Sequence, residues 1–145
     1  MRSLPPSQIG AALVEFALVL PFLLILSTIT VELGRAVQRY NSTAKVVRDA
    51  VRYLSTQTPG THTTEARNLI IYGNTAGTGT PLDSQLTASN VAAPVWQTAG
   101  TGPLINTVTV KVTGYRFQPM AANMFGTAIP AITYGDISAT MRSPL

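Results

Sequence analysis

The chain has no cysteine, and it has a single histidine, His62, and a single tryptophan, Trp96, among its 145 residues. Without cysteine there is no disulfide, which is the usual reinforcement of a small secreted domain, and no thiolate chemistry. One histidine and a few scattered acids do not assemble a metal cluster or a catalytic triad. We therefore expect no metal and no cofactor, and we expect His62 to be a solvated loop residue.

Charge is also scarce, and it is unevenly distributed. Only 11% of the residues are charged, for a formal net charge of +4. Residues 1–31 sum to zero, residues 32–55 carry five cations and two anions, and residues 56–145 carry four cations and three anions. The near-neutral C-terminal part argues against nucleic acid as a partner.

One long apolar run is present, from Ala11 to Val31, and its only charged residue is Glu15. As a helix this segment would rise about 32 Å, enough to cross the core of a bilayer. A carboxylate inside such a segment is costly, so a functional role is the default interpretation. The alternative is a tolerated polar residue near the headgroups. A cleaved secretory signal is disfavoured, because no small-residue cleavage site follows the run.

Helical periodicity continues beyond the apolar run. Apolar residues recur there at spacings of three and four, at Val37, Tyr40, Ala44, Val47, Val51 and Leu54. This pattern predicts an amphipathic stem over residues 32–55 that packs beneath an outer domain. We expect one helix from near Ser7 to near Leu54. Pro21 should bend it, because proline lacks the N–H that would bond the carbonyl of Ala17.

Residues 56–145 are predicted to form the small outer domain. A short helix is expected over residues 64–72, with a threonine among residues 61–64 as its N-cap and Gly73 at its end. Residues 74–102 are rich in Gly, Thr, Ser and Ala. We expect a long loop there, with one strand at residues 91–97.

The C-terminal third has the strand signal. Val108, Val110 and Val112 alternate with polar residues, which predicts a half-buried strand over residues 106–113. At Gly114 the alternation of apolar and polar residues then shifts by one position. A helical turn is expected at residues 119–125, and a last strand at residues 132–141 with a break at Gly135. The predicted fold class is α+β: a long N-terminal helix packed against a small antiparallel sheet.

The N-terminal motif carries a resemblance. Gly10, Glu15 and Pro21, followed by Glu32-Leu-Gly34-Arg35, resemble the TadE-like family. These are minor pilins, or pseudopilins, of the tight-adherence (Tad) pilus, a type IV pilus system of bacteria. Residues 50–53 continue the resemblance, and residues 108–119 and 139–142 support it less specifically. It implies a pilin-like fold and a role in pilus assembly, adhesion and biofilm formation.

The resemblance also implies a mechanism. A prepilin peptidase would remove residues 1–10 as a leader, leaving Ala11 as the new N-terminus. Glu15 would then lie near the terminal ammonium of a neighbouring subunit, and this pairing would offset the cost of a carboxylate in lipid. The implied partners are the peptidase, other major and minor pilins, the inner-membrane assembly platform and membrane lipids. The implied location is the bacterial inner membrane, single-pass, with the C-terminal domain outside the cytoplasm, or an extracellular pilus.

Two other interpretations stay open. An unprocessed, signal-anchored envelope protein with a ligand-binding outer domain would have the same apolar segment. An enzyme is disfavoured. Ser42 and Lys45 have the S-x-x-K spacing of penicillin-binding enzymes, but the S-D-N and K-T-G elements of those enzymes are missing. More cations follow the apolar run than precede it, so the positive-inside rule favours an external N-terminus, whereas a pilin requires the opposite orientation.

Overall fold

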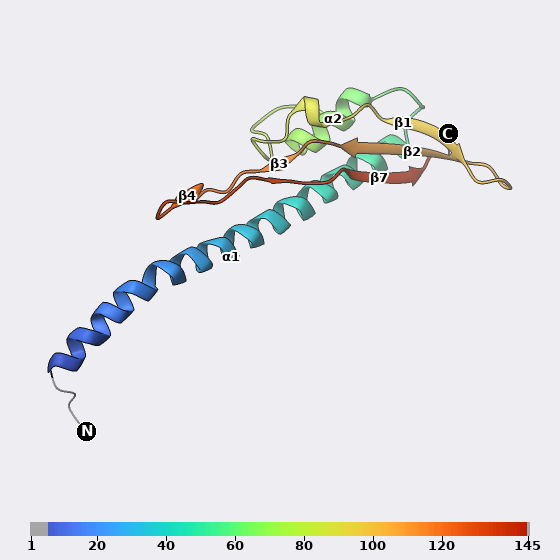
Figure 1. Ribbon diagram of the computed structural model, residues 1–145. Helices are drawn as coiled ribbons and strands as arrows, with labels where there is room; N and C mark the ends of the chain where they lie inside the picture. The colour runs from blue at the N-terminus through green and yellow to red at the C-terminus, as the bar shows by residue number, and fades with distance from the viewer. Residues whose placement is uncertain (1–5, 145) are drawn as a thin grey trace, which may run out of the picture. The chain divides into compact units, whose positions relative to one another are not determined.

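The computed structural model describes residues 6–144. The chain divides into two compact units. The N-terminal unit consists of the chain up to Ala36 together with residues 118–130. The sheet unit consists of residues 37–117 and the chain from Ala131 onward. Figure 1 labels helices α1 and α2 and the strands β1 to β4 and β7.

Helix α1 spans Pro6–Ser55, so the single long helix predicted from the sequence is confirmed. Pro21 lies inside α1 without ending it, and the bend expected there stays a prediction. Of the predicted leader, residues 1–5 lie outside the described residues, and residues 6–10 form the beginning of α1.

The sheet unit is built on a three-stranded antiparallel sheet in the order β1-β2-β7. These strands are β1 Val95–Ala99, β2 Ile105–Val112 and β7 Ile137–Arg142. Strand β2 places Val112 opposite Ile137, Val110 opposite Ala139 and Val108 opposite Met141, so these apolar residues share one face. The same core cluster contains Val47, Ala50, Val51 and Leu54 of α1. The predicted α+β architecture is therefore confirmed.

Helix α2, Thr63–Tyr72, adds Ala66, Ile70 and Ile71 to the core. Gly73 ends it as predicted, with a φ of 74° and its N–H donated to the carbonyl of Leu69. The predicted threonine cap is wrong. His62 occupies the N-cap position in a left-handed conformation, and its side chain makes no capping hydrogen bond.

The long segment after α2 is held to the core at a few points. Its one regular element before β1 is the short helix η1, Ala88–Asn90, and its Leu86 and Val91 are buried. The strand predicted at residues 91–97 begins later, at Val95, because Val91 forms only an isolated bridge with Val112. Strands β3, Arg116–Phe117, and β6, Ile132–Thr133, form a separate antiparallel pair. The predicted break near Gly135 is confirmed, since it lies between β6 and β7.

In the N-terminal unit, residues 118–130 form a hairpin, with β4 Asn123–Met124 paired to β5 Thr127–Ala128. The helical turn predicted at residues 119–125 is therefore wrong. Phe125 and Gly126, between the two strands, have φ angles of 48° and 80°. Two consecutive positive φ angles are typical of the tight hairpin turns whose twist matches that of the strands.

Candidate functional site

The N-terminal part of α1 exposes its apolar side chains. From Gly10 onward this helix is long and apolar enough to cross a membrane, and its most apolar stretch has no buried residue. Residues 11–20 are exposed without exception, including Leu13, Phe16 and Leu18. Exposed apolar surface of this extent marks a lipid or protein contact. The segment indicates a single-pass membrane anchor.

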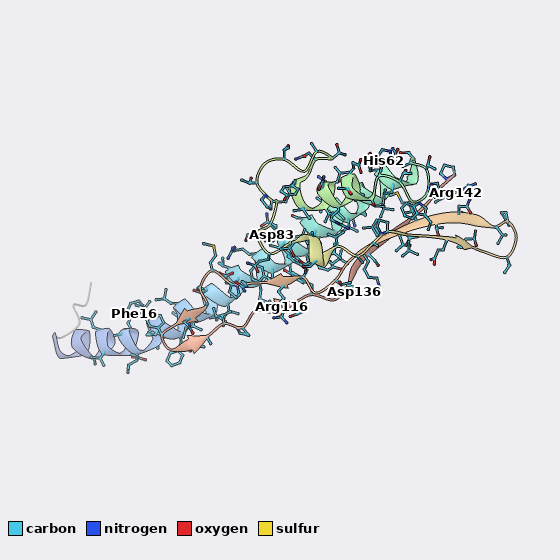
Figure 2. All side chains as sticks on the ribbon, turned by 90° about the horizontal axis from the view of Figure 1, so that it is seen from above. Phe16, His62, Asp83, Arg116, Asp136 and Arg142 are labelled. Carbon is cyan, nitrogen blue, oxygen red and sulfur yellow. The ribbon has the colours of Figure 1, made fainter. Side chains whose placement is uncertain are left out.

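Glu15 lies in this exposed stretch, one position before Phe16, which Figure 2 labels. Among the described residues its carboxylate has no hydrogen-bond or ion-pair partner. Glu15 is therefore an acid on an apolar helix surface, and residues on the neighbouring turns of α1 supply no donor to its carboxylate.

Gly10 and Ala11, the predicted processing positions, are both exposed on α1. A Cβ built at Gly10 meets no atom within 4 Å. Packing among the described residues therefore gives no reason for glycine at this position, and a larger side chain fits there without a clash.

The stem residues divide into two groups. Val47, Val51 and Leu54 are fully buried, and Ala44 packs against the same core. Ala50, which is not part of the predicted stripe, is buried with them. Tyr40 is half-exposed and rests on the ring of Tyr134, with 5.7 Å between the ring centroids. Val37 is 60% exposed, so its predicted packing is wrong. The predicted stripe begins too early, at Val37, because apolar spacing alone does not show at which residue of α1 the packing against the sheet begins.

A buried polar cluster in the sheet unit was not predicted. The Asp83 carboxylate accepts a hydrogen bond from the Tyr115 hydroxyl, pairs with the Arg39 guanidinium, and accepts the Gln85 backbone N–H at 2.9 Å. Burial acts to raise the pKa of Asp83, but these three donors hold that pKa below its ordinary value. Figure 2 labels Asp83 on the segment between α2 and η1.

Tyr115 completes this cluster. Burial, together with the adjacent Asp83 carboxylate, raises the pKa of Tyr115 to about 12. Its ring stacks on Tyr134, with 5.1 Å between the centroids. The cluster joins α1, the long loop and the chain before β3, which indicates a structural role. No local pattern reveals it, because its three members are far apart in the sequence.

Glu32 plays a comparable part in the N-terminal unit. It is only 6% exposed. One of its carboxylate oxygens accepts the backbone N–H of Met120 at 3.1 Å and that of Ala121 at 3.4 Å, and the other pairs with Arg35 at 2.7 Å. In the sequence Glu32 is recognisable only as part of a motif, whereas in the structure its carboxylate binds the hairpin to α1.

His62 is exposed, as expected, and contacts Glu65 at 3.2 Å and the Tyr53 hydroxyl at 3.4 Å. Within residues 6–144, no group of three histidine, cysteine, aspartate or glutamate side chains is placed to hold a metal ion.

Comparison with known proteins bears on the apolar segment and the stem. Residues 10–52 match the family model described as TadE-like protein. The N-terminal part of this chain is thus similar to TadE-like proteins over these residues. The match begins at Gly10, includes Glu15 and ends in the stem, and it leaves all of the strands outside. No curated protein and no solved structure matches the chain.

Proposed function

We propose that this chain is a minor pilin, or pseudopilin, of a Tad-type pilus, processed after Gly10 and contributing to pilus assembly, adhesion and biofilm formation. The observation that carries the proposal is Glu15: an acid exposed on a membrane-length apolar helix, inside the TadE-like match. An intramembrane carboxylate of this kind needs a partner to offset its desolvation.

The proposed partner is the terminal ammonium of a neighbouring subunit. Cleavage after Gly10 creates that ammonium at Ala11, beside the exposed apolar surface. Attraction between the two charges is strong in a medium of low dielectric constant, so a docked pair favours one register between adjacent helices. Processing therefore prepares the chain for assembly, because the uncut chain lacks this positive charge.

The sheet unit favours a minor role over a shaft-forming one. The major pilin of the resembling family is little more than the membrane helix, whereas this chain adds a core of its own around β1, β2 and β7. In the proposed arrangement α1 anchors the chain in the bacterial inner membrane, with the C-terminal part outside the cytoplasm. Its partners are the prepilin peptidase, other major and minor pilins, and the assembly platform.

Processing can be tested by co-expressing the chain with its cognate peptidase and measuring the intact mass. We expect the wild-type chain to lose residues 1–10 and the Gly10→Val variant to stay uncut. Gly34→Val is the matched control, because Gly34 lies in the same helix and a Cβ there also meets no atom within 4 Å. This control should be cut normally.

An unchanged mass in the presence of peptidase that cleaves another prepilin would contradict the proposal. Cleavage of Gly10→Val at the wild-type rate would also contradict it. A chain from native membranes that still begins at Met1 would instead support the unprocessed, anchored envelope protein.

A further inference from the structure

Strand β7 is an edge strand of the sheet, with β2 as its neighbour in the order β1-β2-β7. The Ser143 N–H is donated to the carbonyl of its register partner Asn106 at 2.8 Å, which shows which residues of the β2–β7 ladder bond to each other. Because bonded and non-bonded pairs alternate in an antiparallel ladder, Ser138, Thr140 and Arg142 direct their backbone N–H and C=O groups away from β2. No other part of the described chain bonds to this row of groups.

The side chains of β7 do little to protect this edge. Edge strands are commonly shielded by lysine, by proline or by a bulge. Strand β7 contains neither lysine nor proline, and its pairing with β2 is regular from Ile137 to Arg142. Ser138 and Thr140 are small and exposed. A further strand therefore has access to the unpaired backbone groups.

A groove runs along this edge, between β7 and α1. Its volume is about 480 Å³, and it is lined on one side by residues 136–141 and on the other by Tyr40, Asn41, Ala44 and Arg48 of α1. Figure 2 labels Asp136 and Arg142 at the two ends of β7. Successive side chains of a strand point to opposite faces, so a strand added to β7 would direct every second side chain into the groove.

The α1 side of the groove is basic. Arg48 lines it, and Lys45 and Arg52 share its side of the helix, at spacings of three and four residues. Only one anion lies among them in the sequence, and none of the three cations forms an ion pair within residues 6–144. On the β7 side, Asp136 already pairs with Lys111 at 3.3 Å. The groove thus has positive charge that a carboxylate would complement.

We propose that the edge of β7 binds an extended peptide segment of a partner protein by adding it to the sheet, with a carboxylate of that segment against Arg48. Backbone hydrogen bonds to Ser138 and Thr140 supply the affinity in this mode, and the groove selects the side chains on one face of the added strand. The contact requires neither cleavage after Gly10 nor pairing of Glu15, so its failure and the failure of the proposed function are distinguishable.

The probe is a fluorescent peptide with blocked ends and the sequence Thr-Val-Thr-Glu-Thr-Val-Thr, whose valines and glutamate share one face of a strand. Two further peptides carry Gln or Lys in place of Glu. Another keeps the Glu between two prolines, which prevent strand pairing. Anisotropy measures their binding to the full chain, one copy per lipid nanodisc. We expect the Glu peptide to bind about fivefold more tightly than the Lys peptide, and the proline peptide not to bind.

A charge reversal on α1 tests the acidic character of the partner. Arg48→Glu changes an exposed residue, so the core is kept. It should reverse the preference, with the Lys peptide binding about fivefold more tightly than the Glu peptide. Arg116→Glu is the matched control, because Arg116 is exposed and lies outside the groove lining. An unchanged preference in Arg48→Glu, or the same reversal in both variants, would overturn the proposal.

A proline in β7 tests strand addition itself. Thr140→Pro removes an N–H that points away from β2, which an edge strand tolerates. It should weaken binding of the Glu peptide about tenfold. Thr98→Pro makes the matching change on the opposite edge of the sheet, in β1, and should leave binding unchanged. Trp96 fluorescence verifies that both variants fold. Wild-type affinity in a folded Thr140→Pro variant would contradict strand addition, and if that variant does not fold, Arg48→Glu decides.

Absence of binding by every peptide up to about 1 mM would overturn the proposal. Equal binding of the proline peptide and the Glu peptide would also overturn it, because it would show attraction to the cations alone. Nanodiscs that hold two copies of the chain test the competing occupant. If peptide binding is lost there and kept at one copy, the edge belongs to a second copy of this chain and the proposed partner is wrong.

Discussion

The two parts of α1 use apolar side chains in opposite ways. Up to Val31 the helix is almost wholly apolar, yet Leu18, Phe22 and Leu26 are among its most exposed side chains. From Val37 onward it is amphipathic, and Val47, Val51 and Leu54 are inaccessible to solvent. The part with fewer apolar residues therefore contributes more to the core. Arrangement on the helix surface, rather than apolar content, decides which part folds with the strands.

Charge follows the same division. Glu15 is alone in the apolar run, whereas Lys45, Arg48 and Arg52 cover the exposed side of the stem. A uniformly apolar helix needs an apolar environment supplied by lipid or by other helices, while a striped, charged one is complete with a single covered face. The first part thus suits membrane insertion and assembly, and the second suits support of the sheet unit.

The largest expected effect comes from removing the stem. A chain beginning at Gln57 loses Val47, Val51 and Leu54 from its core, and each such burial contributes about 1.5–3 kcal/mol against a domain stability of roughly 5–15 kcal/mol. We expect this fragment to be unfolded and a chain beginning at Arg35 to fold. Circular dichroism melting and amide dispersion will compare them. A cooperative transition in the shorter fragment, close to that of the longer one, would mean that the sheet stands without the stem.

Two leucine-to-alanine substitutions in the full chain compare the stem with the apolar part of α1. Leu54→Ala should lower the free energy of unfolding of the sheet unit by about 2–5 kcal/mol, because it leaves a cavity in the core. Leu26→Ala, the matched control at a 63% exposed position, should change it by less than about 0.5 kcal/mol. Denaturant titration in micelles, followed by Trp96 fluorescence from β1, measures both. A similar loss of unfolding free energy in both variants would contradict the view that only the stem part of α1 contributes to the core.

Tyr115→Phe tests the polar cluster under the loop. The substitution removes a hydrogen bond to a buried carboxylate, so we expect a loss of about 1.5–3 kcal/mol. The native pKa of Tyr115 is raised to about 12. The contribution of Tyr115 to the free energy of unfolding should therefore be complete below the unfolded-state pKa of about 10. It should fall as the pH rises through the native pKa. Unfolding titrations across this alkaline range should show the fall in the wild type and a smaller fall in the variant; parallel curves would contradict this.

The smallest effect is expected at Gly73. Its φ of 74° is left-handed, and an alanine there should cost the sheet unit about 1 kcal/mol. Gly34→Ala, in the interior of α1 with open space around its Cβ, should not lower the same transition. Thermal unfolding monitored at Trp96 compares them, and an unchanged melting temperature for Gly73→Ala would show that the cap relaxes without strain.

Periodic signals made the backbone of this fold predictable. The long helix and β2 follow directly from apolar spacing, since Val108, Val110 and Val112 alternate strictly with polar residues. Helix α2 was predicted from its end signals, of which Gly73 is confirmed and the threonine cap is wrong. The β4–β5 hairpin was missed because its turn is formed by Phe125 and Gly126, and phenylalanine gives no turn signal. Residues 119–122 also resemble the start of a helix, with a proline followed by methionine and alanines.

The candidate site was predictable only where it is local in sequence. The spacing of Gly10 and Glu15 is visible directly, whereas the Asp83 cluster joins residues 39, 83 and 115 and depends on the tertiary fold. Glu32 stood within a recognisable motif, but its bonds to Met120 and Ala121 cross most of the chain. Pairings of this kind carry no signal in a single sequence.

The central claim is that the charge of Glu15 serves assembly. Removing it should ease membrane insertion, because charged residues oppose insertion, so Glu15→Leu should be inserted and cut normally. Crosslinking in native membranes measures whether this variant contacts other pilins, with Glu15→Asp as the control that keeps a carboxylate. We expect the crosslinks to be lost in Glu15→Leu and retained in Glu15→Asp. Crosslinking of Glu15→Leu at the wild-type yield would contradict it.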